Sequence, residues 1–517
     1  MTSCLWLERP GRWRTLGVTT LLLVAVLPAV PLLWRSAVSP NSATAFVGAT
    51  FGGALRNGAA VAVLVAVVSL LVGLPTGVLS ALYEFPARNI LLALTALPLL
   101  IPSFLRAVGW AMLAARLGPA VTDAISGLAG CTLVLSTGAV PLVLLTSYVA
   151  AIALSGSQID AARLAGGERT VLIYVSRHVA SPALLAAGLG CVLALSDPGP
   201  GQILGLQTAA SEMLTSFSAL YDFPLAGRQC AVLTALVLMM AVPLAFLTAP
   251  RLASEIMARQ ARAARRIRHR GVAGVTVTGL SLLVLAGTVA PLVGLTLPLA
   301  GGGELIRAWG ELSRTAGNTL LYATGAGGIA ATLGLLLAVC SGRSDRLRTV
   351  CVGTALALFS LPPALTALGV VQLATTAPAW ADPLLRSRLT VCVALGLRFF
   401  PVAAVLGLRA WGSTSATWTL AAAVHGVPAT VYLWRVVLPL LLPAGAVAAL
   451  LVALLATAEV STVLLLHPPG KSSLSLAIFT VMANAPESLV AALCLVYLAV
   501  AAGLLAALWV AAGGGKG

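Results

Sequence analysis

Charged residues are scarce in this sequence. Only 9% of its 517 residues are charged, whereas soluble globular domains carry about 25%. The mean hydropathy is +1.02. A soluble globule is therefore excluded, and the composition predicts an all-α, polytopic membrane protein.

Signatures of catalysis and metal binding are also missing. The eight cysteines never form a CxxC pair and the four histidines are scattered, so neither a zinc site nor a disulfide framework is predicted. The sequence has no Gly-rich phosphate loop ending in Lys-Ser or Lys-Thr, no Ser-His-Asp signature and no paired carboxylates. We therefore expect no enzyme activity, no cofactor and no bound metal on this chain, and an intramembrane enzyme is disfavoured.

Long apolar runs recur along the whole chain. A helix needs ~20 apolar residues to cross a hydrocarbon core of roughly 30 Å. About twelve runs meet this requirement, and they predict the spans 16–34, 58–82, 90–114, 131–154, 182–196, 230–249, 272–298, 317–340, 350–374, 389–408, 443–466 and 489–511.

The basic residues predict an orientation. With the amino terminus in the cytoplasm, 20 of the 31 Lys and Arg residues fall in cytoplasmic segments and 9 on the opposite side, while Arg106 and Arg398 lie within spans. Cytoplasmic loops retain more basic residues, so both termini are expected in the cytoplasm. The net charge of +16 is spread over loops, which disfavours nucleic acid as a partner. The densest basic run, 259–270, is expected to lie against anionic lipid headgroups.

The sequence repeats itself at a nearly constant offset. Pro102 and Pro362 are 260 residues apart, and so are Pro141 and Pro401. Further pairs at 260 to 262 are Gly166 and Gly426, Asn57 and Asn318, Pro182 and Pro443, and Asp197 and Glu459. This pattern predicts two parallel repeats of six helices each, flanking a central path. The predicted domains are 1–250, a basic cytoplasmic linker 251–271, and 272–517.

One segment in each half contains an interrupted helix between two apolar spans. Each has two consecutive alanines followed four residues later by glycine: Ala161, Ala162 and Gly166 in the first half, and Ala421, Ala422 and Gly426 in the second. Small alanines allow another surface to approach, and glycine permits a sharp turn. Pro439, after Leu438, is expected to begin the next helix. The topology places both segments, here called elbows, in the cytoplasm.

Three charged residues in or beside spans are candidates for the transport path. Asp197 and Glu459 occupy matching positions at the outer ends of the spans that follow the elbows. Arg398 lies deeper, within LGLRFFP. Charges inside a membrane are costly and commonly functional, so all three are predicted to face the path or a docked binding protein. The alternative, a solvated helix end for the two acids, stays open.

The elbows resemble the coupling loops of the membrane permeases of binding-protein-dependent ABC importers. Those loops carry Glu-Ala-Ala, three residues, Gly, and later Leu-Pro. Asp160, Ala161, Ala162 and Gly166 match in the first half. In the second half the matching residues are Ala421, Ala422, Gly426, Leu438 and Pro439. The resemblance implies that each elbow docks on an ABC ATPase subunit, two copies in all, that a substrate-binding protein delivers the solute, and that the chain lies in a bacterial inner membrane.

Two fused six-span halves with these motifs look most like the ferric-iron permease branch. The resemblance therefore implies ferric iron as the substrate, with thiamine, phosphonate and polyamine branches as alternatives. A twelve-helix secondary transporter of the major facilitator type is the competing class. The loop 341–348 resembles its Gly, Asp and Arg-rich motif, but the spacing differs and the equivalent loop 84–88 lacks it.

Overall fold

The protein is a bundle of long helices. The computed structural model describes residues 11–32, 34, 47–257, 266–267, 269–299, 303–482 and 484–511. In these ranges the chain is helical, with one isolated parallel β-bridge between Tyr83 and Ile267. Ten helices are long and apolar enough to span a membrane, and the number is twelve if each of two bent pairs counts as one span. The predictions of an all-α fold and of a multi-pass membrane protein are confirmed.

The helices up to residue 257 form the first series. They are α1 (Arg12–Val26), η2 (Leu27–Ala29), α4 (Phe51–Leu82), α5 (Arg88–Ala96), η3 (Leu97–Leu99), α6 (Ser103–Leu117), α7 (Pro119–Ile125), α8 (Gly127–Ile152), α9 (Gly156–Ser196), α10 (Gly199–Ile203), α11 (Ala209–Ser218) and α12 (Phe223–Met257).

The same order recurs after residue 269. The second series is α13 (Arg270–Val284), the π turn η4 (Leu285–Val289), α14 (Ala290–Thr296), α15 (Gly303–Ser341), α16 (Asp345–Ser360), α17 (Pro363–Thr376), η5 (Ala379–Ala381), α18 (Asp382–Leu385), α19 (Arg388–Ser413), α20 (Ala416–Val424), α21 (Ala429–Tyr432), the π turn η6 (Leu433–Val437), α22 (Leu438–Ala458), α23 (Ser461–Leu466), α24 (Leu474–Val481) and α25 (Glu487–Ala511). Of the predicted linker 251–271, residues 251–257 are the end of α12 and residues 270–271 the start of α13. Residues 258–265 and 268 lie outside the described residues, and the proposed domain boundaries stay a prediction.

Two predicted spans are broken rather than straight. The pair Arg88–Leu99 and Ser103–Leu117 bends by 99°, and the pair Asp345–Ser360 and Pro363–Thr375 bends by 83°. Pro102 and Pro362 stand at the two breaks, where a proline has no N–H to continue the helix. The spans predicted at 90–114 and 350–374 are therefore each divided into two helices by a sharp bend.

Two other expectations are corrected at helix ends. The span expected at 182–196 is the last part of α9, which is helical from Gly156. The span expected at 443–466 ends earlier, at Ala458, and the short α23 follows. Pro439 does not begin a new helix. The helix begins at Ala429, directly after Pro428, and Pro439 follows the π turn η6 inside that segment.

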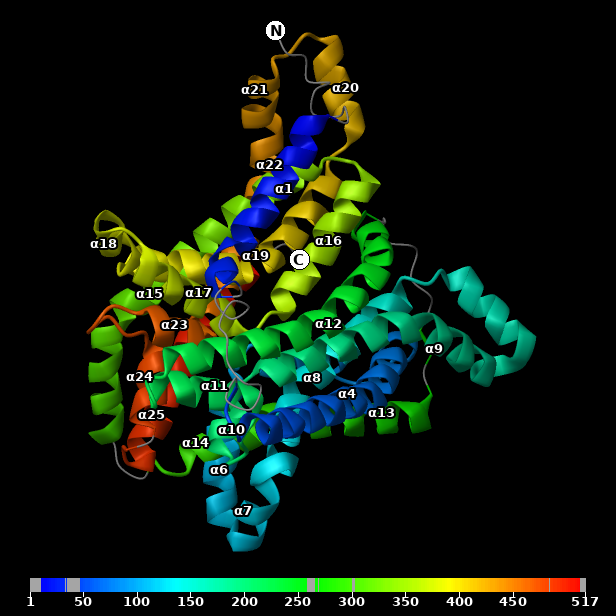
Figure 1. The fold of residues 1–517 in the computed structure, drawn as a ribbon. Coiled ribbons are helices and arrows are strands. Elements are labelled where there is room, and N and C mark those ends of the chain that lie inside the picture. Colours follow the sequence, from blue (N-terminus) through cyan, green and yellow to red (C-terminus); the bar gives the residue numbers. More distant parts are fainter. Residues whose placement is uncertain are drawn as a thin grey trace.

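The first helix of each series packs on the other series. α1 packs on α15 and α16, and η2 on α17, whereas α13 and α14 pack on α4, α5 and α6. The exchange is visible where blue α1 lies beside α16 and green α13 beside α4 (Figure 1). Two glycines 260 residues apart permit it: a Cβ on Gly109 would overlap the carbonyl oxygen of Pro291, and one on Gly369 that of Pro28. The largest apolar cluster also draws side chains from both series, so the two are interlocked.

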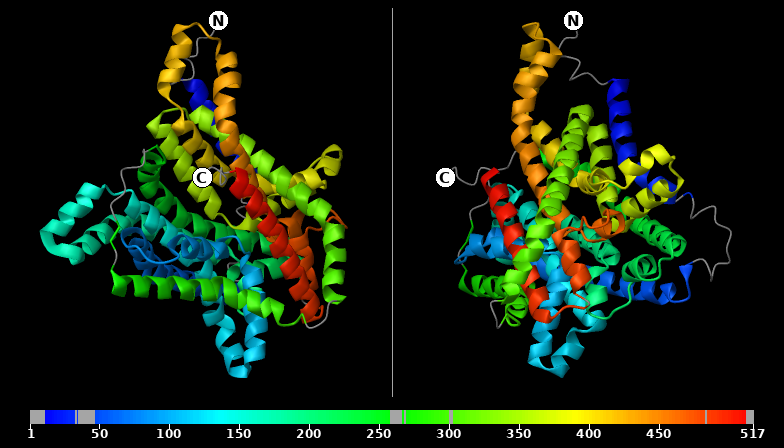
Figure 2. Two further views of the ribbon diagram at one scale, coloured as in Figure 1. Left: turned by 180° about the vertical axis from the view of Figure 1, so that it is seen from behind. Right: turned by 90° about the vertical axis from the view of Figure 1, so that its left-hand side faces the viewer.

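The elbows project from the bundle. α20 and α21 form a protruding hairpin, and the start of α9 forms another (Figure 1). The short helix α7 and the segment around α18 project in other directions, away from both elbows (Figure 2).

Candidate functional site

Both elbows begin with a capped helix and turn at a glycine. Ser155 and Ser415, 260 residues apart, are the N-caps of α9 and α20. In the second elbow Gly426 has φ +67° and ends α20, with Val427 N–H donating to Ala422 O at 2.9 Å and Gly426 N–H to Ala423 O at 3.1 Å. This pair of hydrogen bonds is a Schellman motif, which needs a residue in the left-handed region. The turn predicted at Gly426 is confirmed.

The turn of the first elbow is one residue later than predicted. α9 is interrupted at Gly166 and Gly167, and Gly167 takes the positive φ of 68°. Gly166 is close to extended, and its lack of a Cβ matters because a Cβ there would overlap Thr170 Oγ1. In the first elbow, Gly167 therefore supplies the left-handed turn and Gly166 leaves room for Thr170, whereas in the second elbow Gly426 supplies the turn.

The first elbow is held by charges that the second lacks. Arg163 contacts Asp160 at 3.1 Å and Glu168 at 2.6 Å. Tyr83, at the end of α4, donates to Glu168 at 2.9 Å, and burial together with Glu168 raises the pKa of Tyr83 to about 12. Asp160 is thus engaged within its own elbow. In the second elbow a buried hydroxyl pair, Thr419 with Tyr432 at 3.1 Å, joins the two arms.

Each elbow carries a largely exposed apolar side chain at an equivalent position of the repeat. Leu164 is 90% exposed and Val424 is 84% exposed, and the two positions are 260 residues apart. The alanines that precede them are exposed or partly exposed. The residue that faces inward is also matched, since Ile159 and Thr419 are both buried and 260 apart. The elbows therefore share one exposed apolar position and one buried position, but α20 also partly exposes Trp418 and Leu420, where the first elbow has Gln158 and Asp160. Leu438 and Pro439, by contrast, lie beyond the turn, within the following helix.

The predicted path residues meet in the middle of the bundle. Asp197, Arg398 and Glu459 all line one cavity of about 280 Å³, which takes residues from both series. A second cavity of about 220 Å³ adjoins it. The residues that line both are Pro102, Ser103, Leu193, Asp197, Leu455 and Ala458. These two spaces are called the central cavity below. Because the breaks at Pro102 and Pro362 lie beside it, the bent spans help to shape it.

The two carboxylates have matching local roles. Asp197 ends α9 and accepts the N–H of Gly199 at 2.9 Å, at the start of α10. Glu459 ends α22 and accepts the N–H of Thr462 at 3.2 Å, at the start of α23. Asn57 and Asn318 tie the loops that follow these short helices, donating to Gln207 O at 3.1 Å and Ser472 O at 3.4 Å. The acids therefore cap helices and also line the cavity, and their role in a transport path stays a prediction.

Each carboxylate has one guanidinium as its electrostatic partner. Arg398 acts on Glu459, and Arg106 acts on Asp197. Arg106 is 5% exposed and Arg398 is 8% exposed. Sequence reasoning missed Arg106 as a site residue. It could have been found, because it is a charge inside an apolar span and is as costly there as Arg398.

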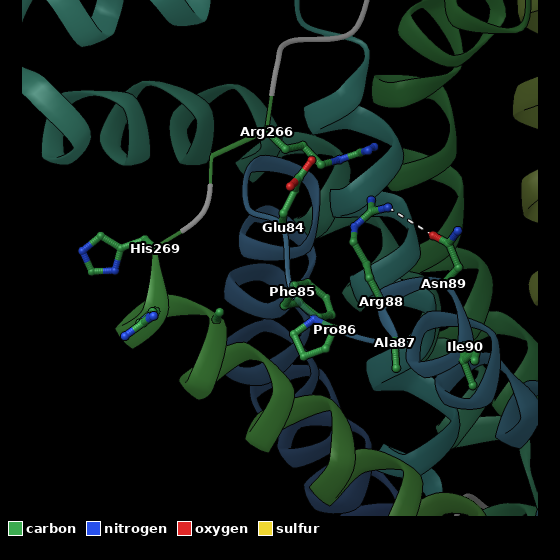
Figure 3. A pocket seen from close by; sticks show the side chains of 11 residues that line it. Glu84, Phe85, Pro86, Ala87, Arg88, Asn89, Ile90, Arg266 and His269 are labelled. Atoms are coloured by element: carbon green, nitrogen blue, oxygen red, sulfur yellow. Dashed lines mark hydrogen bonds between the residues drawn. The ribbon is translucent and has the colours of Figure 1, made fainter.

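A separate basic groove lies beside the first elbow. It measures about 810 Å³ and is lined by Glu84 to Ile90 and by Arg266, His269, Arg270 and Ala273. Arg266 lies near Glu84, and Arg88 donates to Asn89 (Figure 3). Ile267 pairs with the end of α4, accepting from Glu84 N–H at 3.0 Å. Of the basic run 259–270, the structure describes these last residues, and they are pinned to α4; the lipid contact expected for the run stays a prediction.

No protein-family model, no curated protein and no solved structure matches this chain. The shape of the elbows and the chemistry of the central cavity are therefore the basis for a function. Within the described residues there is no group of three or more His, Cys, Asp and Glu side chains that could hold a metal ion.

Proposed function

We propose that the chain is the membrane permease of a binding-protein-dependent ABC importer. The observation that carries the proposal is the pair of protruding elbows, which expose the apolar residues Leu164 and Val424 at equivalent positions. Single exposed apolar residues are common on monomers, so the support for docking lies in the repetition of this position on two capped helices that both end at a glycine turn. The partner is an ABC ATPase, one copy for each elbow.

The remaining features are consistent with this role. The central cavity lies between the two series of helices, where a path would run. Ferric iron is the substrate that the sequence resemblance favours, with thiamine, phosphonates and polyamines as the other candidates. A binding protein would deliver the solute to the side opposite the elbows, and a bacterial inner membrane with both termini in the cytoplasm fits this arrangement.

The experiment is co-purification with candidate ATPase subunits. Leu164→Glu and Val424→Glu place a charge on the exposed surface without touching the buried positions Ile159 and Thr419, so both variants should fold. We expect each to lose at least tenfold in ATPase association, since a buried unpaired charge at an interface costs several kcal/mol. Trp380→Glu is the matched control, because Trp380 is 81% exposed but lies near α18, away from the elbows.

Two outcomes decide the proposal. Loss of association in the two elbow variants but not in Trp380→Glu supports ATPase docking. If the parent binds no ATPase, or both elbow variants bind like the parent, the importer reading is wrong. Solute uptake driven by an ion gradient in the absence of any ATPase would then favour a secondary transporter.

A further inference from the structure

Arg106 occupies, in the first half, the place that the repeat assigns to Arg398. The offset of 260 that relates Pro141 to Pro401 also relates Gly138 to Arg398. The same offset relates Arg106 to Thr366. In the structure a Cβ built on Gly138 would lie 2.9 Å from Arg106 Nη2. The first half therefore has its arginine on α6 rather than on α8, and the guanidinium reaches the position that corresponds to Arg398.

The two guanidiniums are held in similar ways. Arg106 Nη1 donates to Val134 O at 2.8 Å and to Thr137 Oγ1 at 2.5 Å, both on α8. Arg398 Nη1 donates to Phe359 O at 3.0 Å. Its guanidinium carbon lies 5.8 Å from the ring centroid of Phe359 and 6.0 Å from that of Phe399. Each side chain is fixed at one end while its guanidinium lines the central cavity.

Both arginines keep an unused donor. Arg106 Nε and Arg398 Nε are buried and have no hydrogen-bond partner among the described residues. These Nε atoms are sealed from the cavity, so the donors that a solute could meet are the Nη2 groups, which are not among the sealed atoms and make no hydrogen bond among the described residues. Asp197 and Glu459 each accept a backbone N–H at the starts of α10 and α23, so one oxygen of each carboxylate is directed toward those helices.

We propose that the central cavity binds an oxyanion of the transported solute through Arg106 and Arg398, which are positional equivalents on different helices. The oxyanion is a carboxylate, phosphate or phosphonate group, whose planar or tetrahedral oxygens suit the guanidinium fork. A ferric ion would enter this cavity together with such a ligand. The inference rests on the proposed transport function for its solute, but the charge preference of the cavity can be measured on the isolated chain.

The test uses a cysteine placed between the two arginines. Ala458 lines both parts of the central cavity and is partly exposed to it, so Ala458→Cys changes little volume. The purified protein is treated with sulfonatoethyl and trimethylammonioethyl methanethiosulfonate, which are anionic and cationic reagents of similar size. Each rate is divided by that of a free thiol in solution, and the parent chain gives the background from its native cysteines.

We expect the anionic reagent to react about threefold or more faster after this normalisation, because the unbonded Nη2 donors of the two guanidiniums can hydrogen-bond its sulfonate group. Arg106→Gln and Arg398→Gln should each lower this ratio. Arg106→Lys keeps the charge and should keep the ratio. The decisive variant is Arg106→Thr with Gly138→Arg, which moves the arginine to the helix that carries it in the other half and should restore the ratio.

Three results would overturn the inference: a preference for the cationic reagent, a ratio that no arginine variant changes, or a cysteine that neither reagent reaches. If Arg106→Gln does not fold, Arg106→Lys and Arg398→Gln still decide the matter. A merely structural arginine would alter thermal unfolding but not the ratio in the folded protein. ATPase association of the same variants is measured separately. The ratio of reagent rates can therefore be interpreted even if the importer proposal fails.

Discussion

At the scale of single residues, the central cavity separates two kinds of charge. Asp197 and Glu459 cap short helices and balance the guanidiniums, whereas Arg106 and Arg398 retain unmet donors. The four charges sum to zero, which lowers the cost of placing them inside the bundle. A charge-balanced cavity can release a solute more readily than one that holds it with a single uncompensated sign. The carboxylates are therefore expected to set the affinity and the arginines the preference for anions.

The double variant Asp197→Asn and Glu459→Gln tests the part played by the carboxylate charges. Both replacements retain an acceptor oxygen, so the caps on α10 and α23 should survive and stability should change by no more than about 1 kcal/mol. Uptake, measured with labelled ferric iron, thiamine, a phosphonate and a polyamine, should fall severalfold while ATPase association stays intact. Asp197→Ala, which removes the cap as well, is the comparison. Unchanged uptake in the double variant would leave helix capping as the role of these acids.

At the scale of helices, proline and glycine determine the architecture more than hydropathy does. Pro102 and Pro362 break two spans beside the cavity. Pro291 and Pro439 each follow a π turn, because a proline cannot donate the hydrogen bond that would continue a regular helix. Gly109 and Gly369 receive the first helix of the opposite series. The break prolines and the crossing glycines repeat in the two series, whereas both π-turn prolines lie in the second series.

Valine at the crossing glycines should prevent the helix exchange. Gly109→Val and Gly369→Val would place side chains against the carbonyls of Pro291 and Pro28, where backbone must move to make room. Overpacking costs about 1 to 3 kcal/mol when neighbours can shift, and we expect the upper part of that range here. Thermal unfolding in detergent measures the change. Gly317→Ala is the control, since nothing lies within 4 Å of a Cβ there, and it should be neutral or stabilising by about 0.5–1 kcal/mol. Equal stability of all three variants would contradict the close packing of these crossings.

The positions of the helices could largely be predicted from the sequence, but the contacts between them could not. Apolar run length located the spans, because a helix must be apolar wherever it meets lipid. The constant offset paired Asp197 with Glu459, and they do line one cavity. The packing of α1 and α13 on the opposite series could not be predicted from hydropathy, because an apolar face does not specify which helix it packs against. Arg106 was missed because the offset pairs it with Thr366, and only the fold brings it to Gly138.

At the scale of the whole molecule, the interlocked series act as one body. The largest apolar cluster combines Phe104 and Met213 of the first series with Val463 and Ile478 of the second. The exchanged first helices add a second connection. A movement at one elbow therefore has packed contacts through which to reach the central cavity, and the elbows differ in stiffness because Arg163 braces the first.

The orientation of this body in the membrane is the last prediction. The excess of basic residues places the linker and both elbows in the cytoplasm, and the segments around α7 and α18 then face outward. Cysteine variants in intact cells test this with an impermeant thiol reagent. Arg262→Cys and His425→Cys should escape labelling until the membrane is opened, whereas Asp123→Cys and Trp380→Cys should react from outside. His425 is exposed, so a cysteine there should be tolerated. Strong labelling of Arg262→Cys or His425→Cys in intact cells would reverse the orientation, and an ATPase in the cytoplasm could then not reach the elbows.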